Sequence, residues 1–207
     1  DQHLNRIVAM KRIKPSLLKN EDFLSRFVEE AQATSQLQHP GIVPVYEMGQ
    51  YADGHWFFTM KEIKGRTLTE VIQEAHQTLR EKRDQEEAAG RFRFRSLIDT
   101  FHRICETVAY AHNRSVLHRD LKPDNVMLGE HGEVLVVDWG LVKLTDEDVV
   151  TERSTSQEDI NATQMGAIKG TPAYMSPEQA RGATDQVGPH SDVYALGTIL
   201  YEILSGR

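Results

Sequence analysis

The stretch of sequence that decides the fold reads His118-Arg119-Asp120-Leu121-Lys122-Pro123-Asp124-Asn125. It lies between a helical apolar pattern over 97–112 and a short apolar strand expected at 126–128. Transfer of a phosphoryl group to a hydroxyl needs a carboxylate to orient the attacking oxygen and accept its proton. It also needs a cation near the transferred group and hard oxygen ligands for Mg²⁺. Asp120 can supply the first of these, Lys122 the second and Asn125 the third.

This string resembles the catalytic loop of protein kinases, and three further strings stand in the order that the family has. They are Val8-Ala9-Met10-Lys11, Val136-Val137-Asp138-Trp139-Gly140 and Gly170-Thr171-Pro172-Ala173-Tyr174-Met175-Ser176-Pro177-Glu178. The resemblance covers nearly the whole chain and is closest to bacterial eukaryotic-like serine/threonine kinases. Lys122 and the sequence Gly-Thr-Pro-Ala-Tyr at 170–174 favour serine and threonine over tyrosine as acceptors.

The resemblance assigns the nucleotide and metal ligands. Lys11 corresponds to the lysine that holds the α- and β-phosphates of ATP, and Glu30 is the preferred partner for it, with Glu29 as the alternative. Asp138 would chelate Mg²⁺ together with Asn125. Trp139 stands where the family usually has phenylalanine and keeps a large aromatic group that can pack.

The resemblance also assigns an adenine site. Met60 corresponds to the gatekeeper at the back of the nucleotide pocket. Lys61, Glu62 and Ile63 would form the hinge, whose backbone groups meet the adenine. Ala9 is expected to be one of the apolar side chains that sandwich the base.

Residues 138–178 correspond to the activation segment of a kinase. The part over 144–169 is rich in Thr, Ser, Asp, Glu and Gln, a composition too poor in apolar groups to offset its ordering entropy. We therefore expect regulation by phosphorylation there, with Thr163 as the preferred site, followed by Thr151 and Thr155. By resemblance Arg119 would receive the phosphate, Thr171 would be structural, and Asp192 would anchor the catalytic loop backbone.

The predicted fold is α+β and two-lobed, as in protein kinases. Residues 1–60 would form part of a small β-rich N-lobe without the Gly-rich loop. Residues 61–207 would form part of a mainly helical C-lobe without its final helices. Hydrophobic periodicity predicts strands over 6–14, 42–48, 56–60, 126–128 and 134–137, and helices over 21–37, 68–87, 97–112 and 191–205. Ser191 is expected to cap the last helix and Gly206 to end it, and the charged segment 81–95 reads as a solvated insertion or a docking surface.

Composition excludes several other classes of protein. The chain has 207 residues with a formal net charge of −7 and a single cysteine. One cysteine cannot form an intramolecular disulfide framework, and Cys105 lies on the apolar stripe of its helix, so it is expected to pack. No apolar run reaches the roughly 18 residues of a membrane span. The acidic balance argues weakly against a nucleic-acid partner.

Two other functions compete with that of a protein kinase. A small-molecule phosphotransferase shares the Asp and Asn arrangement but usually lacks a long activation segment ending in Pro-Glu. A catalytically inactive kinase-like scaffold would be favoured by loss of Lys11, Asp120, Asn125 or Asp138, and all four are present. The leading interpretation implies protein substrates with Ser or Thr acceptors, a homodimer for trans-autophosphorylation and a cytoplasmic kinase domain, with any membrane anchor elsewhere in the protein.

Overall fold

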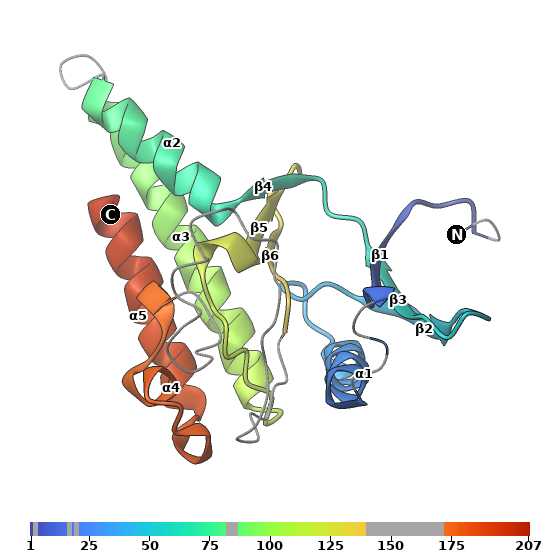
Figure 1. The fold of residues 1–207 in the computed structure, drawn as a ribbon. Helices are drawn as coiled ribbons and strands as arrows, with labels where there is room; N and C mark the ends of the chain where they lie inside the picture. Colours follow the sequence, from blue (N-terminus) through green and yellow to red (C-terminus); the bar gives the residue numbers. More distant parts are fainter. Residues whose placement is uncertain (2–3, 16–17, 19–20, 82–86, 140–171) are drawn as a thin grey trace.

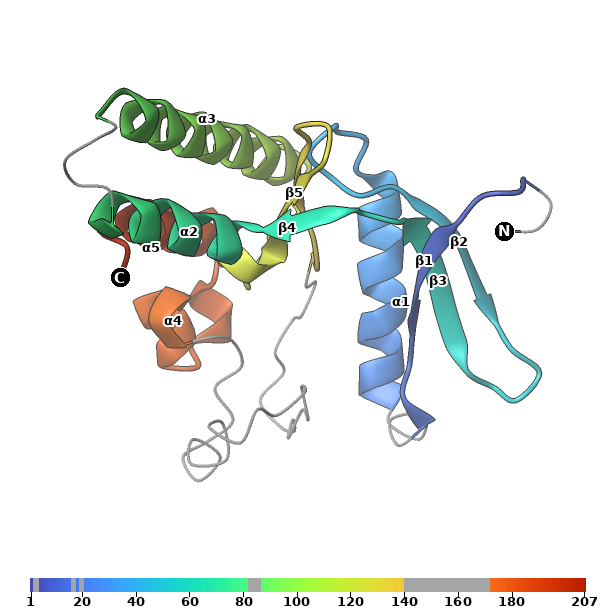
Figure 2. The ribbon, with the colours of Figure 1, turned by 90° about the horizontal axis from the view of Figure 1, so that it is seen from above.

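The first part of the chain forms a small antiparallel sheet flanked by one helix (Figure 1). The computed structural model describes residues 1, 4–15, 18, 21–81, 87–139 and 172–207. Strands β1 (Val8–Arg12), β2 (Val45–Gln50) and β3 (Trp56–Lys61) pair in the order β1-β3-β2. Helix α1 (Glu21–Gln36) lies beside this sheet, as the view from above shows (Figure 2).

The sheet and α1 share a small apolar core. Ile13, Phe27, Ala31 and Phe58 are buried together, and the rings of Phe27 and Phe58 lie 5.1 Å apart between centroids. Phe27 and Ala31 are four residues apart, so they project from the same face of the helix. The apolar stripe of α1 is therefore what holds it against the sheet.

The second part of the chain is mainly helical. It begins with β4 (Gly65–Thr67) and α2 (Leu68–Glu81), and α3 (Glu87–His112) and α5 (Pro189–Ser205) are its longest helices. Strands β5 (Val126–Gly129) and β6 (Val134–Val136) join β4 in a second antiparallel sheet of order β4-β5-β6. The remaining elements are short: α4 (Pro177–Ala180) and the single-turn helices Pro123–Asn125, Pro172–Tyr174 and Thr184–Gln186.

One large core unites these helices with the second sheet. Its most deeply buried members come from α2, α3, β5, β6 and α5, and include Leu68, Ile72, Ile104, Val108, Val126, Val136, Ile199 and Ile203. Cys105 packs at the edge of this core, and burial raises the pKa of its thiol. This environment agrees with the packing role predicted for Cys105 rather than that of a nucleophile.

The two parts of the chain also meet at β6, which contacts the segment that precedes β2. Ile42 forms a parallel bridge with Val136, and the Val136 N–H donates to the Gly41 carbonyl at 2.8 Å. Gly41 lies so close to α3 that a Cβ atom there would come within 2.0 Å of Thr107 Oγ1. A residue without a side chain is needed at this position.

The structure corrects several predicted boundaries. The strand predicted over 42–48 begins only at Val45, because Pro44 has no N–H to donate to a ladder. The predicted strand over 6–14 shortens to Val8–Arg12, and the helix predicted over 68–87 ends at Glu81.

Two helices begin earlier than predicted. Helix α3 starts at Glu87 rather than at residue 97, so much of the segment interpreted as an insertion is helical, and Phe94 within it packs against the core. Helix α5 starts at Pro189 with Gly188 at its N-cap, so Ser191 is not the N-cap residue. It lies at the third helical position, where its Oγ accepts the Gly188 N–H at 3.2 Å. Gly206 ends α5 as predicted, in the left-handed conformation with φ of 68°.

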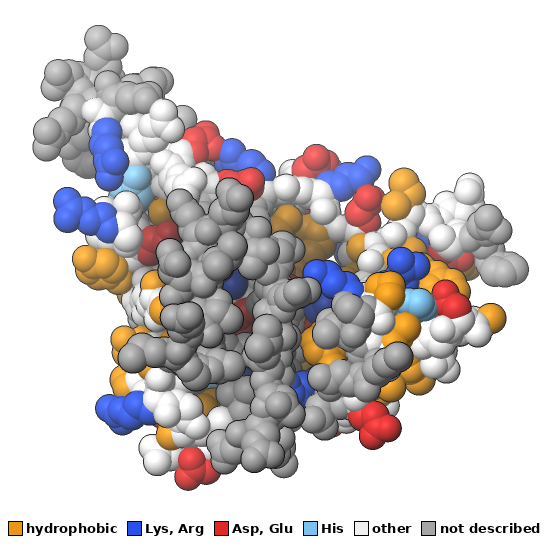
Figure 3. Space-filling model, viewed as in Figure 1, with side chains coloured by type: hydrophobic (Ala, Val, Ile, Leu, Met, Phe, Trp, Pro, Cys, Tyr) orange, Lys and Arg blue, Asp and Glu red, His pale blue; other side chains and the backbone are white. Residues whose placement is uncertain are grey.

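Exposed hydrophobic side chains gather in two places, over the first sheet and along α5 (Figure 3). The larger ones are Ile7, Met10, Tyr46 and Tyr51 in the first group, and Val193, Tyr194, Tyr201 and Leu204 in the second. None of the helices in the described part of the chain combines the length and apolar character needed to cross a membrane.

Candidate active site

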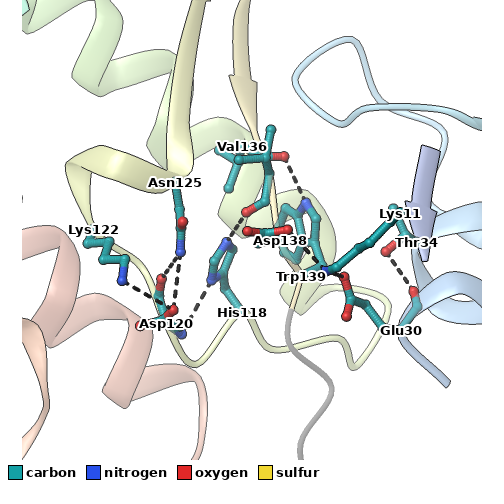
Figure 4. Close-up of polar contacts among 11 residues, drawn as sticks. Lys11, Glu30, Thr34, His118, Asp120, Lys122, Asn125, Val136, Asp138 and Trp139 are labelled. Carbon is teal, nitrogen blue, oxygen red and sulfur yellow. Dashed lines mark hydrogen bonds and ion pairs between the residues drawn. The ribbon is translucent and has the colours of Figure 1, made fainter. Parts of the chain in front are cut away.

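Lys11 joins the two parts of the molecule at the candidate site (Figure 4). Its Nζ atom lies 2.5 Å from Glu30 Oε1 and 3.2 Å from Asp138 Oδ1. Burial alone lowers the pKa of this ammonium, but the two carboxylates outweigh burial and raise the pKa of Lys11 above its ordinary value. Lys11 is therefore a fixed cation between a strand, a helix and the segment after β6.

Of the two glutamates left open by the sequence, Glu30 is the one that contacts Lys11. Glu29 instead accepts a hydrogen bond from Ser25 Oγ at 3.2 Å. Neighbouring residues of a helix point about 100° apart, so only one of the two can face the sheet.

The three catalytic candidates of the loop contact one another. Asn125 Nδ2 donates to the backbone carbonyl of Asp120 at 2.7 Å and lies 3.3 Å from Asp120 Oδ2. Lys122 Nζ lies 3.6 Å from the same Oδ2 atom. The single-turn helix Pro123–Asn125 turns the chain back, which brings Asn125 against the carboxylate five residues before it.

Asp192 fixes the backbone of this loop from beneath, as the sequence predicts. The residue is 1% exposed, and its Oδ2 and Oδ1 atoms accept the N–H groups of His118 and Arg119 at 2.9 and 2.8 Å. Burial by itself raises the pKa of this carboxyl. The hydrogen bond with His112 Nε2, 2.8 Å from Oδ2, and the other N–H donors outweigh burial, and the pKa of Asp192 is lowered.

His118 is buried and uncharged beneath the loop. Its Nδ1 atom accepts the N–H of Asp120 at 3.3 Å, and its Nε2 atom lies 3.0 Å from the Val137 carbonyl. This network assigns the proton to Nε2. Burial lowers the pKa of His118. The imidazole thus connects the loop that carries Asp120 to the segment that carries Asp138.

Asp138 and Trp139 leave β6 in an unusual backbone conformation. Asp138 has a φ of 58°, in the left-handed region that few residues other than glycine adopt. Trp139 is 1% exposed, packs its ring 4.9 Å from that of His118, and donates its indole N–H to the Val136 carbonyl at 3.0 Å. The last residue of this string, Gly140, lies outside the described residues.

The residues assigned to the adenine site lie along β1, β3 and the link to β4. Ala9 is directly opposite Met60 in the β1–β3 pair. Lys61 belongs to β3 rather than to the link: its N–H donates to the Pro44 carbonyl at 3.2 Å, and its Nζ lies 3.3 Å from Glu133 Oε1. Glu62 and Ile63 form the connection that follows.

The residues at and just after the end of the predicted activation segment pack against the loop that carries Asp120. Gln179 Nε2 donates to the Arg119 carbonyl at 2.7 Å. Glu178 accepts from Ser191 Oγ at 2.5 Å, and hydrogen bonds from Ser191 and Ser176 lower the pKa of Glu178 to about 2. Thr163, Thr151, Thr155 and Thr171 lie outside the described residues.

Three polar contacts of the site region did not follow from the sequence motifs. They involve Gln179, His112 and the Lys61–Glu133 pair. The partners are 60, 80 and 72 residues apart along the chain. No local pattern indicates such pairs, so only the fold reveals them.

The donor set suits a magnesium nucleotide better than a dedicated metal cage. Among the described residues, no three His, Cys, Asp or Glu side chains are grouped as such a cage would need. Mg²⁺ is usually held by one or two carboxylates together with phosphate oxygens and water. The Asp138 carboxylate, 3.2 Å from Lys11 Nζ, and the Asn125 amide beside Asp120 are ligands of that kind (Figure 4).

Comparison with known proteins decides the family. The sequence profile described as "Protein kinase domain" matches residues 1–207. This chain belongs to the protein kinase domain family. The resemblance stated from four short strings is thereby confirmed over the whole chain.

Two similar proteins are bacterial kinases. Serine/threonine-protein kinase PknD of Protochlamydia amoebophila is 40% identical over 212 residues, which cover 99% of this chain and 21% of that protein. PknD of Chlamydia caviae is 40% identical over 210 residues, covering 99% and 22%. The chain thus spans about a fifth of the length of these curated relatives.

A solved structure shows the same fold. A mutant kinase domain of Mycobacterium tuberculosis PknI aligns with a TM-score of 0.60 at 22% identity, covering 97% of this chain and 64% of that one. This kinase-domain neighbour confirms the predicted two-lobed α+β fold.

Proposed function

We propose that this kinase domain is the catalytic core of a protein serine/threonine kinase that transfers the γ-phosphoryl group of ATP to Ser or Thr hydroxyls of proteins. One observation carries the proposal. Lys11, held by Glu30, reaches across to Asp138, while Asp120 stands with Lys122 and Asn125 at the neighbouring loop. The PknD relatives, which are named serine/threonine-protein kinases, support the choice of acceptor.

In the proposed reaction the acceptor hydroxyl oxygen bonds to the γ-phosphorus while the bond between that phosphorus and the β–γ bridging oxygen breaks. Asp120 orients the hydroxyl and accepts its proton, and ADP leaves. Lys122 offsets charge on the transferred group, and Lys11 holds the nucleotide phosphates. Asp138 and Asn125 would hold Mg²⁺, which neutralises phosphate charge when it is bound.

The remaining assignments follow from the same proposal. Residues 1–60 act as the N-lobe and 61–207 as the C-lobe, with the nucleotide between them. The gatekeeper is Met60, and adenine meets the backbone of Lys61, Glu62 and Ile63 and the side chain of Ala9. We place the domain in the cytoplasm, where ATP is available.

We further propose that phosphorylation at Thr163, by a second copy of the chain in a homodimer, orders the activation segment. A phosphate adds about −1.5 to −2 charge, which the Arg119 guanidinium can pair with. Mass mapping of the autophosphorylated protein tests the site. Full activity of Thr163→Ala would overturn this choice of residue without affecting the kinase assignment.

The decisive experiment follows transfer of labelled γ-phosphate from ATP to a generic basic protein, using the full-length gene product. Asp120→Asn should lower turnover by about 10²–10⁴-fold, the usual worth of positioned acid–base catalysis, with nucleotide binding nearly unchanged. Asp124→Asn is the matched control: it lies in the same loop, is exposed and accepts from Thr69 Oγ1 at 3.0 Å. We expect it to keep most of the turnover.

An inactive scaffold is the alternative function. It predicts ATP binding with no transfer above the level of Asp120→Asn. Wild-type turnover in Asp120→Asn would instead show that the role of Asp120 is wrong.

A further inference from the structure

Trp139 makes a hydrogen bond that a phenylalanine at the same position could not make. Its indole N–H donates to the Val136 carbonyl three residues earlier, at 3.0 Å (Figure 4). This bond closes a turn around Val137 and Asp138. The indole is 1% exposed and its ring lies tilted by 53° against His118, so the donor has little access to water.

The turn closed by this bond contains a strained residue. Asp138 has a φ of 58°, and a residue other than glycine persists in this conformation only where contacts around it offset the strain. Ahead of Asp138, the Val137 N–H donates to the Asn125 carbonyl at 2.9 Å and the Val137 carbonyl lies 3.0 Å from His118 Nε2. On the C-terminal side of Asp138, among the described residues, the hydrogen bond of the Trp139 indole to the Val136 carbonyl comes next.

The strained residue carries the carboxylate that meets Lys11. Asp138 Oδ1 lies 3.2 Å from Lys11 Nζ, and the backbone torsions of residue 138 set the direction of its side chain. A change of φ to an ordinary negative value would point the carboxylate elsewhere. Contacts that stabilise this φ therefore also fix the position of the Asp138 carboxylate.

We propose that Trp139 is a positioning residue: its indole N–H bond to the Val136 carbonyl holds Asp138 in the left-handed conformation that orients its carboxylate for a magnesium nucleotide. The inference rests on the proposed function, because it assumes that Asp138 is the metal ligand. It goes beyond that function by assigning a role to Trp139, which stands where the family usually has phenylalanine.

The test removes the N–H while keeping an aromatic ring. Binding of a fluorescent ATP analogue to the full-length gene product is measured while Mg²⁺ is titrated. The Mg²⁺ concentration that gives half of the maximal binding is the Mg²⁺ midpoint. Binding of the same analogue is also measured in excess EDTA. Trp139→Phe should raise the Mg²⁺ midpoint about 2- to 10-fold, the effect of losing one neutral hydrogen bond. Affinity for the analogue in EDTA should stay within about twofold, since Asp138 acts through the metal.

A matched control is available, because the chain has two tryptophans. Trp56 lies in β3 and packs against the core of the first sheet. Trp56→Phe makes the same chemical change there and should leave the Mg²⁺ midpoint unaltered.

Since phenylalanine is smaller than tryptophan, Trp139→3-benzothienylalanine is the second variant. It keeps the shape of the indole and replaces its N–H with sulfur. A raised Mg²⁺ midpoint in this variant supports the hydrogen bond as the cause. An unchanged midpoint, or an equal loss of binding with Mg²⁺ and with EDTA, would overturn the proposal and leave Trp139 as a packing residue. If the wild-type protein gains no affinity from Mg²⁺ at all, the metal role of Asp138 fails first, and this inference fails with it.

Discussion

Asp192→Asn tests how strongly the buried carboxylate supports the catalytic loop. Asp192 Oδ1 accepts the Arg119 N–H at 2.8 Å, and Oδ2 lies 2.9 Å from the His118 N–H and 2.8 Å from His112 Nε2. Asparagine keeps the volume of the side chain but has one oxygen and one NH₂ group. In the better orientation the amide oxygen keeps the two contacts of Oδ2, and the NH₂ group faces the Arg119 N–H, donor against donor.

The cost of this change follows from the contacts. A buried N–H that loses its acceptor costs about 1–3 kcal/mol. The two retained bonds lose the assistance of a negative charge, which is worth up to about 1 kcal/mol each. We therefore expect Asp192→Asn to lower the free energy of unfolding by about 2–4 kcal/mol, against a total of about 5–15 kcal/mol for an ordinary domain. The domain should remain folded at 25 °C, but turnover should fall because the backbone before Asp120 is no longer fixed.

Urea denaturation at pH 7 measures this loss, with phosphoryl transfer as the second readout. The matched control is Asp185→Asn, an exposed aspartate in the single-turn helix Thr184–Gln186, which should change stability by less than about 0.5 kcal/mol. If Asp192→Asn costs no more than this control, the carboxylate does not support the loop and the reasoning is refuted. A change in the slope of the transition rather than its midpoint would point to an altered denatured state.

Two further predictions concern packing and pH. Gly41→Ala would bring a Cβ atom within 2.0 Å of Thr107 Oγ1 and should lower the free energy of unfolding by about 1–3 kcal/mol in urea titrations. Adding Thr107→Ala should recover part of that stability. The control is Gly197→Ala, which has no atom within 4 Å of its Cβ and should be neutral or stabilising. Because burial lowers the pKa of His118 below its ordinary 6.5, the unfolded chain takes up a proton before the folded one does. Stability present above pH 6.5 should then be lost as the pH falls, and the loss between pH 7.5 and 5.5 should be smaller in His118→Asn; an equal loss in both would contradict this.

The candidate site was predictable where its chemistry is local in sequence. Asp120, Lys122 and Asn125 lie within one short loop, and the single-turn helix Pro123–Asn125 brings the first and last together. The resemblance added Lys11 and Asp138 because strings in a known order also specify which elements carry them. Between Glu29 and Glu30 the motif left both possible, and the rotation of α1 relative to β1 decided for Glu30.

The starts of two helices were not predictable from hydrophobic periodicity. Periodicity detects only the buried stripe, and in α3 that stripe becomes regular at Leu97, whereas the helix begins at Glu87. The turns between them contain two Ala and three Arg residues, which favour helix without a regular apolar stripe. In α5 the N-cap is Gly188 and a proline occupies the first position. Ser191 lies at the third position, where its Oγ accepts the Gly188 N–H and donates to Glu178.

Backbone strain is the feature of the site that was least predictable from the sequence. Arg119 and Asp138 have φ values of 66° and 58°, yet neither is a glycine, so neither residue type announces a left-handed turn. Each stands next to a group that the proposed chemistry must orient, Asp120 in one case and its own carboxylate in the other. Asp192 binds the N–H of the first, and Trp139 closes the turn around the second. Strained residues persist only where the surroundings over-determine them. The buried carboxylate and the buried indole are therefore best understood as parts of the active site, although neither touches a reacting atom.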